Sequence, residues 1–193
     1  MLNIIIFGKP GSGKGTQASL IKDKYSLTHI STGDVFRKNI SNKTDLGLLA
    51  KRYMDKGELV PDQVTVDMLN QEIVNFLPCN GFIFDGFPRT TFQAKKLDKL
   101  LQKDSLKIDL IIALDVDNTT LTERLLERGK SSGRSDDQSV QKINFRLHEY
   151  DTKTKPLINF YKLQNKFFLI NGIGSLKEIS SRIIGVIEDY NND

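Results

Sequence analysis

The chain has 193 residues, of which 38% are hydrophobic and 27% charged, and its formal net charge at pH 7 is +4. This length and balance are typical of a globular protein that buries its core without disulfides or metal ions. The single cysteine, Cys79, cannot form an internal disulfide, and the sequence has no Cys/His cluster to hold zinc. No apolar run approaches the roughly 18 residues of a membrane span, and no signal peptide is recognisable. We therefore expect a cytoplasmic protein that does not bind membranes.

The positive charge has two interpretations, because basic groups collect either nucleic acid or a small phosphorylated ligand. Lysines and arginines are spread along the chain and mixed with acids, without a basic block of about five or six residues. The pattern favours the small phosphorylated ligand over nucleic acid.

Short apolar runs alternate with amphipathic segments, which favours a parallel sheet with helical crossovers. The predicted strands are residues 2–7, 28–31, 82–85, 110–116 and 167–171. The predicted helices are residues 14–25, 34–40, 62–77, 91–103, 119–128, 138–163 and 175–189. We expect a bend in the helix 138–163 near Pro156, since proline removes a backbone donor. Asp117 or Asn118 is the expected N-cap of the helix 119–128, and Ser175 forms a capping box with Glu178.

Two glycine-bearing segments, 41–59 and 128–138, interrupt this alternation. Ligands of open α/β folds bind beyond the carboxyl ends of the strands, where such insertions lie. The sequence therefore predicts one core with two small mobile parts, for which Gly129 and Gly133 are expected flexible points.

The segment 8–16 reads GKPGSGKGT, directly after the first strand and at the start of a helix. Its glycine and lysine spacing matches the P-loop, in which backbone N–H groups and a helix N-terminus surround phosphate oxygens. The dinucleotide-binding fingerprint fails, because Thr16 stands where its third glycine belongs. The phosphate-binding residues predicted from this loop are Gly11, Ser12, Gly13, Lys14, Gly15 and Thr16.

The residue after Lys14 is Gly15, so the hydroxyl that usually binds Mg²⁺ in a P-loop is displaced to Thr16. The metal must then be held by water, substrate oxygens and another carboxylate. Asp85 ends a predicted strand and is the candidate, because Mg²⁺ often takes only one or two carboxylates besides phosphates. We predict Mg²⁺ as the cofactor, held by Asp85 through water, and no zinc.

Gly86 follows Asp85 where many hydrolytic ATPases place a glutamate, which favours transfer over hydrolysis. The segment 42–45 matches the guanine motif Asn-Lys-x-Asp, but it follows a helical segment and we regard the match as chance. Transferring phosphoryl groups requires cationic stabilisation, which planar guanidinium groups provide well. Arginines stand beside these turns and motifs at positions 37, 89, 128, 134 and 146. A nucleotide-binding switch or ATPase remains a distant alternative.

Over nearly its whole length the chain resembles the adenylate kinases, a branch of the nucleoside monophosphate kinase family. The resemblance is carried by GKPGSGKGTQ at 8–17, STGD at 31–34 with Arg37, GELVP at 57–61, DGFPR at 85–89 with Gln93, RGKSSGRSDD at 128–137, and Arg146. It implies a three-layer αβα fold with a five-stranded parallel sheet in its core (1–30, 61–127 and 138–193), a small helical monophosphate-binding segment (31–60) and a short lid (128–137). Only residues 129–133 lie between Arg128 and Arg134, so the lid resembles the short form without a zinc site.

The resemblance also implies the reaction, the reversible transfer of a phosphoryl group from MgATP to AMP without a covalent intermediate, which maintains the balance of adenine nucleotides. The implied catalytic residues are Lys14, Arg89, Arg128, Arg134 and Arg146. Besides the P-loop, Arg128, Arg134 and Gly174 would bind ATP. The implied AMP-binding residues are Thr32, Arg37, Glu58, Leu59, Val60, Gly86, Arg89, Gln93, Arg134 and Arg146. A monomer that binds ATP, AMP and ADP is expected.

Some positions leave the assignment open or lie outside it. The lid also resembles that of UMP/CMP kinases, whereas Thr32 and Gln93 resemble the adenylate choice and favour AMP. Asp136 and Asp137 are expected to fasten the closed lid. Lys9 replaces the usual alanine or glycine, and we expect its side chain to point to solvent.

Overall fold

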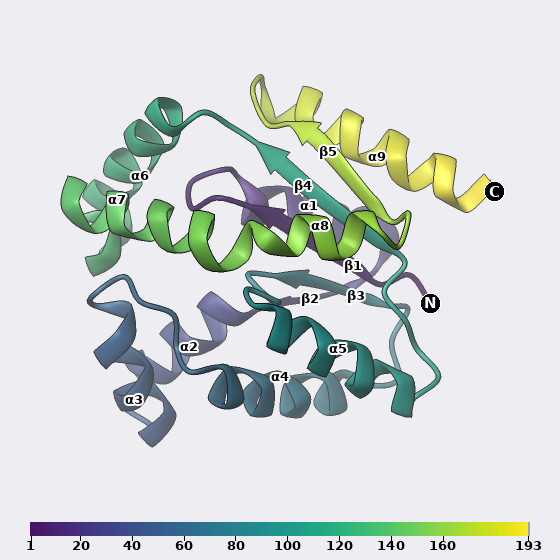
Figure 1. Ribbon diagram of the computed structural model, residues 1–193, viewed down its shortest axis with the longest axis horizontal. Coiled ribbons are helices and arrows are strands. Elements are labelled where there is room, and N and C mark those ends of the chain that lie inside the picture. Colours follow the sequence, from purple (N-terminus) through teal and green to yellow (C-terminus); the bar gives the residue numbers. More distant parts are fainter. Residues whose placement is uncertain (193) are drawn as a thin grey trace.

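The computed structural model describes residues 1–192 and contains a five-stranded parallel sheet (Figure 1). The strands are β1 (Ile4–Gly8), β2 (Thr28–Ser31), β3 (Phe82–Asp85), β4 (Leu110–Asp115) and β5 (Phe167–Asn171). Their order across the sheet is β2-β3-β1-β4-β5, with every neighbouring pair parallel. This confirms the predicted α/β fold, and places the loop that follows β1 at the middle of the sheet.

Helices cover both faces of the sheet and make it a three-layer structure (Figure 1). One face packs against α4 (Asp62–Phe76), α5 (Thr91–Lys103) and α8 (Pro156–Lys162). The other packs against α1 (Lys14–Tyr25) and α9 (Leu176–Asn192). Because successive strand residues point to opposite faces, Ile5 enters the first core cluster and Ile4 and Ile6 the second. The isoleucine-rich run of β1 is thus buried on both sides, as parallel strands usually are.

The remaining helices gather beyond the carboxyl ends of the strands, on the left of Figure 1. They are α2 (Thr32–Ser41) and α3 (Asp45–Met54) on one side, and α6 (Asn118–Ser132), the 3-10 turn η1 (Ser135–Asp137) and α7 (Val140–Glu149) on the other. None of the described helices is long and apolar enough to cross a membrane.

The segment 41–59, expected to be a small insertion within a helical monophosphate-binding segment, contains the helix α3. Thr44 caps α3 by accepting a hydrogen bond from the backbone N–H of Gly47 at 3.0 Å. A Cβ atom on Gly47 would lie 2.1 Å from the carbonyl oxygen of Asn39 in α2. The glycine that suggested a loop is therefore a packing residue, which lets α3 lie directly against α2.

The lid segment also differs from the expectation, because α6 continues beyond Arg128 to Ser132. A Cβ atom on Gly129 would lie 2.5 Å from the carbonyl oxygen of Asp137, so this glycine allows a close approach inside a helix. Its assignment as a flexible point was wrong. Gly133 has a φ of 64° and ends α6 in the left-handed conformation that glycine favours at this position.

The helix predicted over 138–163 is divided into α7, a π-helical turn η2 (Tyr150–Thr154) and α8. Pro156 is the first residue of α8, and the backbone N–H of Lys155 donates to the carbonyl of Tyr150 at 2.8 Å. A proline cannot donate a backbone hydrogen bond and crowds the preceding turn, which is relieved where that turn is wide. The interruption was predicted near Pro156, and the wide turn lies just before it.

The predicted helix caps are found. Asp117, and not Asn118, caps α6 by accepting from the backbone N–H of Thr120 at 2.8 Å. Ser175 and Glu178 form the capping box before α9, since each side chain accepts from the other's backbone N–H.

Candidate active site

A cavity of about 890 Å³ opens at the carboxyl edge of the sheet, between α2 and the α6–α7 pair. Every residue to which the sequence analysis gave a role in binding ATP, AMP or Mg²⁺ lines this cavity. They come from the loop after β1 and the start of α1, from α2, from the segment between α3 and α4, from the end of β3 and the loop after it, from α5, α6 and α7, from the turn after α6, and from the turn before α9. Ligands of doubly wound sheets bind at this edge, which makes the cavity the candidate active site.

The P-loop connects β1 to α1, and its glycines adopt conformations that other residues rarely reach. Gly8, Gly11 and Gly13 have φ angles of 148°, 85° and 94°. No side chain caps the first turn of α1. The N–H groups of this turn, together with the helix dipole, are therefore available to phosphate oxygens.

Lys14 folds back over this loop, where its ammonium donates to the carbonyls of Gly8 at 2.7 Å and Lys9 at 3.0 Å. Burial lowers the pKa of Lys14 to about 8. This value includes the charges of Arg89, Arg146 and Arg128, which lower the pKa in the same direction as burial, and the carboxylate of Asp85, which opposes them. The site is thus a concentration of positive charge that suits a polyanion.

Lys9 does not point to solvent, so the sequence expectation was wrong. Its ammonium donates to Asn118 Oδ1 at 2.9 Å and to Asp151 Oδ2 at 3.0 Å. Asn118 begins α6 and Asp151 belongs to the π-helical turn. Lys9 therefore ties the P-loop to both ends of the α6–α7 pair, a contact between distant segments that the sequence could not reveal.

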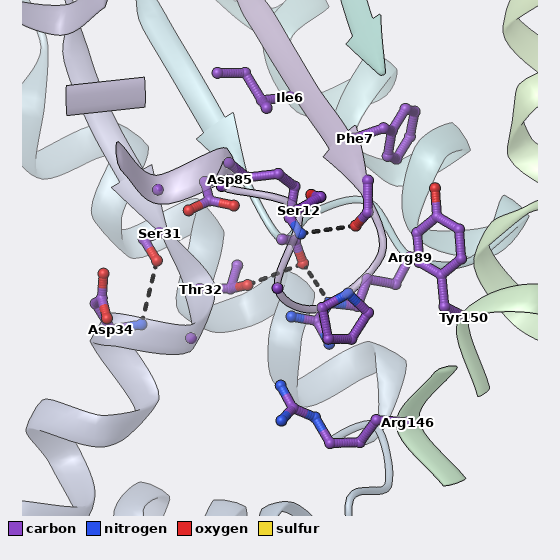
Figure 2. Close-up of a pocket in the computed structure, with 18 of the residues that line it drawn as sticks. Ile6, Phe7, Ser12, Ser31, Thr32, Asp34, Asp85, Arg89, Arg146 and Tyr150 are labelled. Carbon is purple, nitrogen blue, oxygen red and sulfur yellow. Dashed lines mark hydrogen bonds between the residues drawn. The ribbon is translucent and has the colours of Figure 1, made fainter. Parts of the chain in front are cut away.

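On the other side of the cavity, the carbonyl of Gly86 accepts two hydrogen bonds (Figure 2). Thr32 Oγ1 donates to it at 3.0 Å and Arg89 Nε at 2.8 Å. The bond through Nε leaves the terminal NH₂ groups of Arg89 in the cavity, where Arg146 also extends its guanidinium (Figure 2). Burial and then the charge of Arg146 lower the pKa of Arg89 from its usual value. Paired guanidinium groups of this kind suit a shared phosphate.

The two lid acids, Asp136 and Asp137, form ion pairs with arginines. Asp137 is fully buried and accepts from Arg128 at 2.6 and 3.1 Å and from Arg146 at 2.5 Å. Asp136 pairs with Arg146 at 3.0 Å. Burial alone would raise the pKa of Asp137, but its bonds to Arg128 and the charge of Arg146 outweigh burial and lower it. These ionised acids hold the two arginines of α6 and α7 beside each other.

Asp85 fits the role of a single carboxylate that faces a hydrated cation. It is 9% exposed, and a Cβ atom on Gly15 would lie 3.4 Å from its Oδ2, so the missing side chain keeps access open. Burial acts to raise the pKa of Asp85, but His29 and Lys14 outweigh it and keep the group ionised. No group of three or more His, Cys, Asp or Glu residues within residues 1–192 is placed to hold a metal directly. This donor set suits Mg²⁺ bound through water and phosphate oxygens.

The sequence model of the adenylate kinase family matches this chain over residues 6–166. The chain belongs to the adenylate kinase family. It is 54% identical over 189 residues to the adenylate kinase of Flavobacterium psychrophilum, covering 98% of this chain and 100% of the relative. The adenylate kinase of Flavobacterium johnsoniae is 52% identical with the same coverage. That of Parabacteroides distasonis is 50% identical over 183 residues, covering 95% of this chain and 96% of the relative.

Several cavity contacts were not predicted from the sequence. His29 lines the cavity, with its Nε2 atom 3.6 Å from Asp85 Oδ2. Thr154 Oγ1, in the π-helical turn, donates to the carbonyl of Arg89 at 3.1 Å. Asp62 is hydrogen-bonded to Gln93 at 2.8 Å. No local pattern marks these residues, because each acts through a partner far along the chain.

Proposed function

We propose that this protein transfers the terminal phosphoryl group of MgATP to AMP, giving two molecules of ADP, and also catalyses the reverse reaction. The observation that carries the proposal is the arrangement of one cavity with a P-loop on one side and the Thr32–Gly86–Arg89 cluster on the other. Arginines from α6 and α7 lie between the two. Such a site serves two phosphorylated ligands whose phosphates meet in the middle.

In this proposal the P-loop and Lys14 hold the ATP phosphates, and Arg128 and Arg134 contact ATP from the lid side. The backbone of Gly174 lies near the adenine of ATP, because it lines the cavity at the end where α1 and α9 meet. Arg37 and Arg89 bind the phosphate of AMP. The segment 58–60 covers the adenine of AMP, whose edge is read by Gln93 with Thr32 beside it.

The reaction needs no covalent intermediate, since the AMP phosphate oxygen attacks in line with the leaving ADP. The residues act by positioning and by neutralising charge on the transferring group. Lys14, Arg89, Arg128, Arg134 and Arg146 supply that positive charge. Asp85 would hold Mg²⁺ through water, and the bound ion would add positive charge beside the phosphates.

The segments 31–60 and 128–137 close over the substrates as two small mobile domains on a monomeric cytoplasmic protein. Two contacts between these segments support the proposed closure. Ser135 Oγ donates to Asp55 Oδ1 at 2.8 Å, and the guanidinium of Arg134 lies 3.7 Å from the carboxylate of Asp34. Closure excludes water, which would otherwise compete with AMP for the phosphoryl group.

The proposal is tested by following ATP, AMP and ADP together in a single reaction. We expect two ADP for each AMP consumed and no phosphate release. The variant Arg89→Ala should lower kcat/KM for AMP on the order of 10³-fold, because an arginine that neutralises the transferring group contributes about that much. Arg52→Ala is the matched control, since Arg52 is exposed on α3. Near-normal turnover of Arg89→Ala would contradict the assigned role.

A further inference from the structure

Gln93 is held by hydrogen bonds to both ends of its side-chain amide. It is 2% exposed, it lies in the first turn of α5, and it lines the cavity. Its Oε1 accepts from the backbone N–H of Arg89 at 2.7 Å, and its Nε2 donates to Asp62 Oδ1 at 2.8 Å. Thr90 Oγ1 donates to the other carboxylate oxygen, Asp62 Oδ2, at 2.8 Å. Asp62 is thus fixed in turn.

These partners allow only one orientation of the amide. A backbone N–H can only donate a hydrogen bond, and an ionised carboxylate can only accept. The amide oxygen of Gln93 must therefore face Arg89, and its nitrogen must face Asp62. In the opposite orientation two donors would face each other at Arg89 and two acceptors at Asp62, and mismatches of this kind are costly in a buried site.

The fixed orientation decides which base edge the amide can read. A side-chain amide offers two lone pairs and two N–H groups. Arg89 uses one lone pair and Asp62 one N–H, so one of each remains for a ligand. Adenine presents the N6 amino donor beside the N1 acceptor, whereas guanine presents the O6 acceptor beside the N1–H donor. For a base held in place by its ribose and phosphate, the donor and acceptor of adenine match the observed orientation of the Gln93 amide. The donor and acceptor of guanine match the opposite orientation.

We propose that Asp62 is a specificity-determining residue, which makes the acceptor site select adenine over guanine by fixing the orientation of the Gln93 amide. The inference rests on the proposed role of Gln93 in reading the base. Asp62 is not among the described residues that line the cavity, so it acts through Gln93 as a positioning residue.

The test compares kcat/KM for AMP and GMP in the variant Asp62→Asn. An asparagine of the same shape can donate as well as accept, which removes one of the two mismatches of the opposite amide orientation. We expect the AMP/GMP ratio to fall about ten-fold, the effect of one buried unsatisfied group, while KM for MgATP is unchanged. Asp67→Asn is the matched control, because it removes the same charge from the same helix, where Asp67 is exposed and accepts a hydrogen bond from the neighbouring Gln63. Its ratio should stay at the wild-type value.

A second pair of variants probes the same network without altering the carboxylate. Thr90→Val removes the hydroxyl that holds Asp62 and should lower the AMP/GMP ratio by a smaller factor, and Thr90→Ser should restore it. Melting temperatures of all variants are measured alongside, so that a loss of fold is recognised.

The outcomes separate this inference from the proposed function. If the wild-type protein shows no preference for AMP, or Gln93→Ala keeps the preference, the base-reading role of Gln93 is wrong. If Gln93→Ala loses the preference but Asp62→Asn and Thr90→Val keep the wild-type ratio, the inference about Asp62 alone is overturned. An equal fall of kcat/KM for both nucleotides in Asp62→Asn also overturns it, because that result indicates a structural role.

Discussion

Binding of MgATP should be accompanied by proton uptake at Lys14. Before nucleotide binds, the pKa of this lysine is lowered to about 8, chiefly by burial and also by Arg89, Arg146 and Arg128. A bound triphosphate reverses the sign of that environment, because opposite charge close to an ammonium favours its protonated form. The pKa should then return to its ordinary value of 10.5 or above.

The size of the effect follows from the two pKa values. A group that moves from a pKa of about 8 to 10.5 takes up about 0.1 proton at pH 7, about 0.5 at pH 8 and about 0.9 at pH 9. Because only the charged lysine binds the phosphates well, the affinity for MgATP should be about ten-fold weaker at pH 9 than at pH 7. The full shift corresponds to about 3 kcal/mol between the two protonation states.

The lowered pKa of Lys14 makes the protein without nucleotide more stable as the pH rises. A lysine in an ordinary ion pair has a raised pKa and makes a protein less stable as the pH rises. Between about pH 8 and pH 10.5 the unfolded chain binds more protons at this position than the folded chain does. The contribution of Lys14 to the free energy of unfolding therefore rises with pH across that window, by up to about 3 kcal/mol. Below pH 8 the folded protein bears the whole cost of the buried ammonium.

Calorimetric titration in buffers of different ionisation enthalpy measures the proton uptake directly. At pH 8 and 9 the phosphates of ATP are already ionised, since a phosphate monoester has its second pKa at about 6, and they release no protons. Lys14→Arg is the control, because a guanidinium stays charged throughout and the pH-dependent uptake should vanish. Uptake at pH 9 of less than about 0.1 proton per bound nucleotide in the wild-type protein would refute the reasoning.

Three further predictions concern the arginines and their partners. Arg89→Lys should lower kcat/KM for AMP roughly 10²-fold, because it loses the Gly86 anchor that positions the charge; steady-state kinetics check this, and a loss below about three-fold would contradict it. The side chains of Lys9 and Asp151 are 23% and 36% exposed. A double-mutant cycle of Lys9→Met and Asp151→Asn, measured as free energies of unfolding, should therefore give a coupling energy of about 0.5–1 kcal/mol. Additive effects of the two substitutions would argue against the contact. Asp137→Asn leaves two arginines facing a neutral amide and should lower the free energy of local opening of residues 128–137 by about 2–4 kcal/mol. Hydrogen exchange over these residues should therefore become faster, and unchanged protection would contradict the prediction.

The parts of the fold that were predictable are those whose signals are local. β1 is a continuous apolar run because it is buried on both faces, and the P-loop spacing follows directly from the turn that phosphate binding needs. The caps Asp117 and Ser175 act on backbone groups only a few residues away. The arginines were found because they accompany motifs, and the structure gathers them around one cavity.

The parts that were missed depend on contacts between distant segments. Gly129 looked like a flexible point and Gly47 marked only an insertion, yet at both positions another backbone approaches too closely for a Cβ atom. Lys9 looked like a solvated lysine because its partners Asn118 and Asp151 lie more than a hundred residues away. The role of Asp62 is visible only when its carboxylate and the amide of Gln93 are seen in contact.

The measurement that tests the account most directly is the rate of ADP formation from MgATP with AMP, UMP, CMP and GMP supplied separately. The account predicts a strong preference for AMP, and almost no turnover when no acceptor is present. A preference for UMP or CMP would keep the fold and the phosphate chemistry but contradict the roles of Thr32 and Gln93. ATP consumption that does not depend on any acceptor would indicate an ATPase and contradict the central claim.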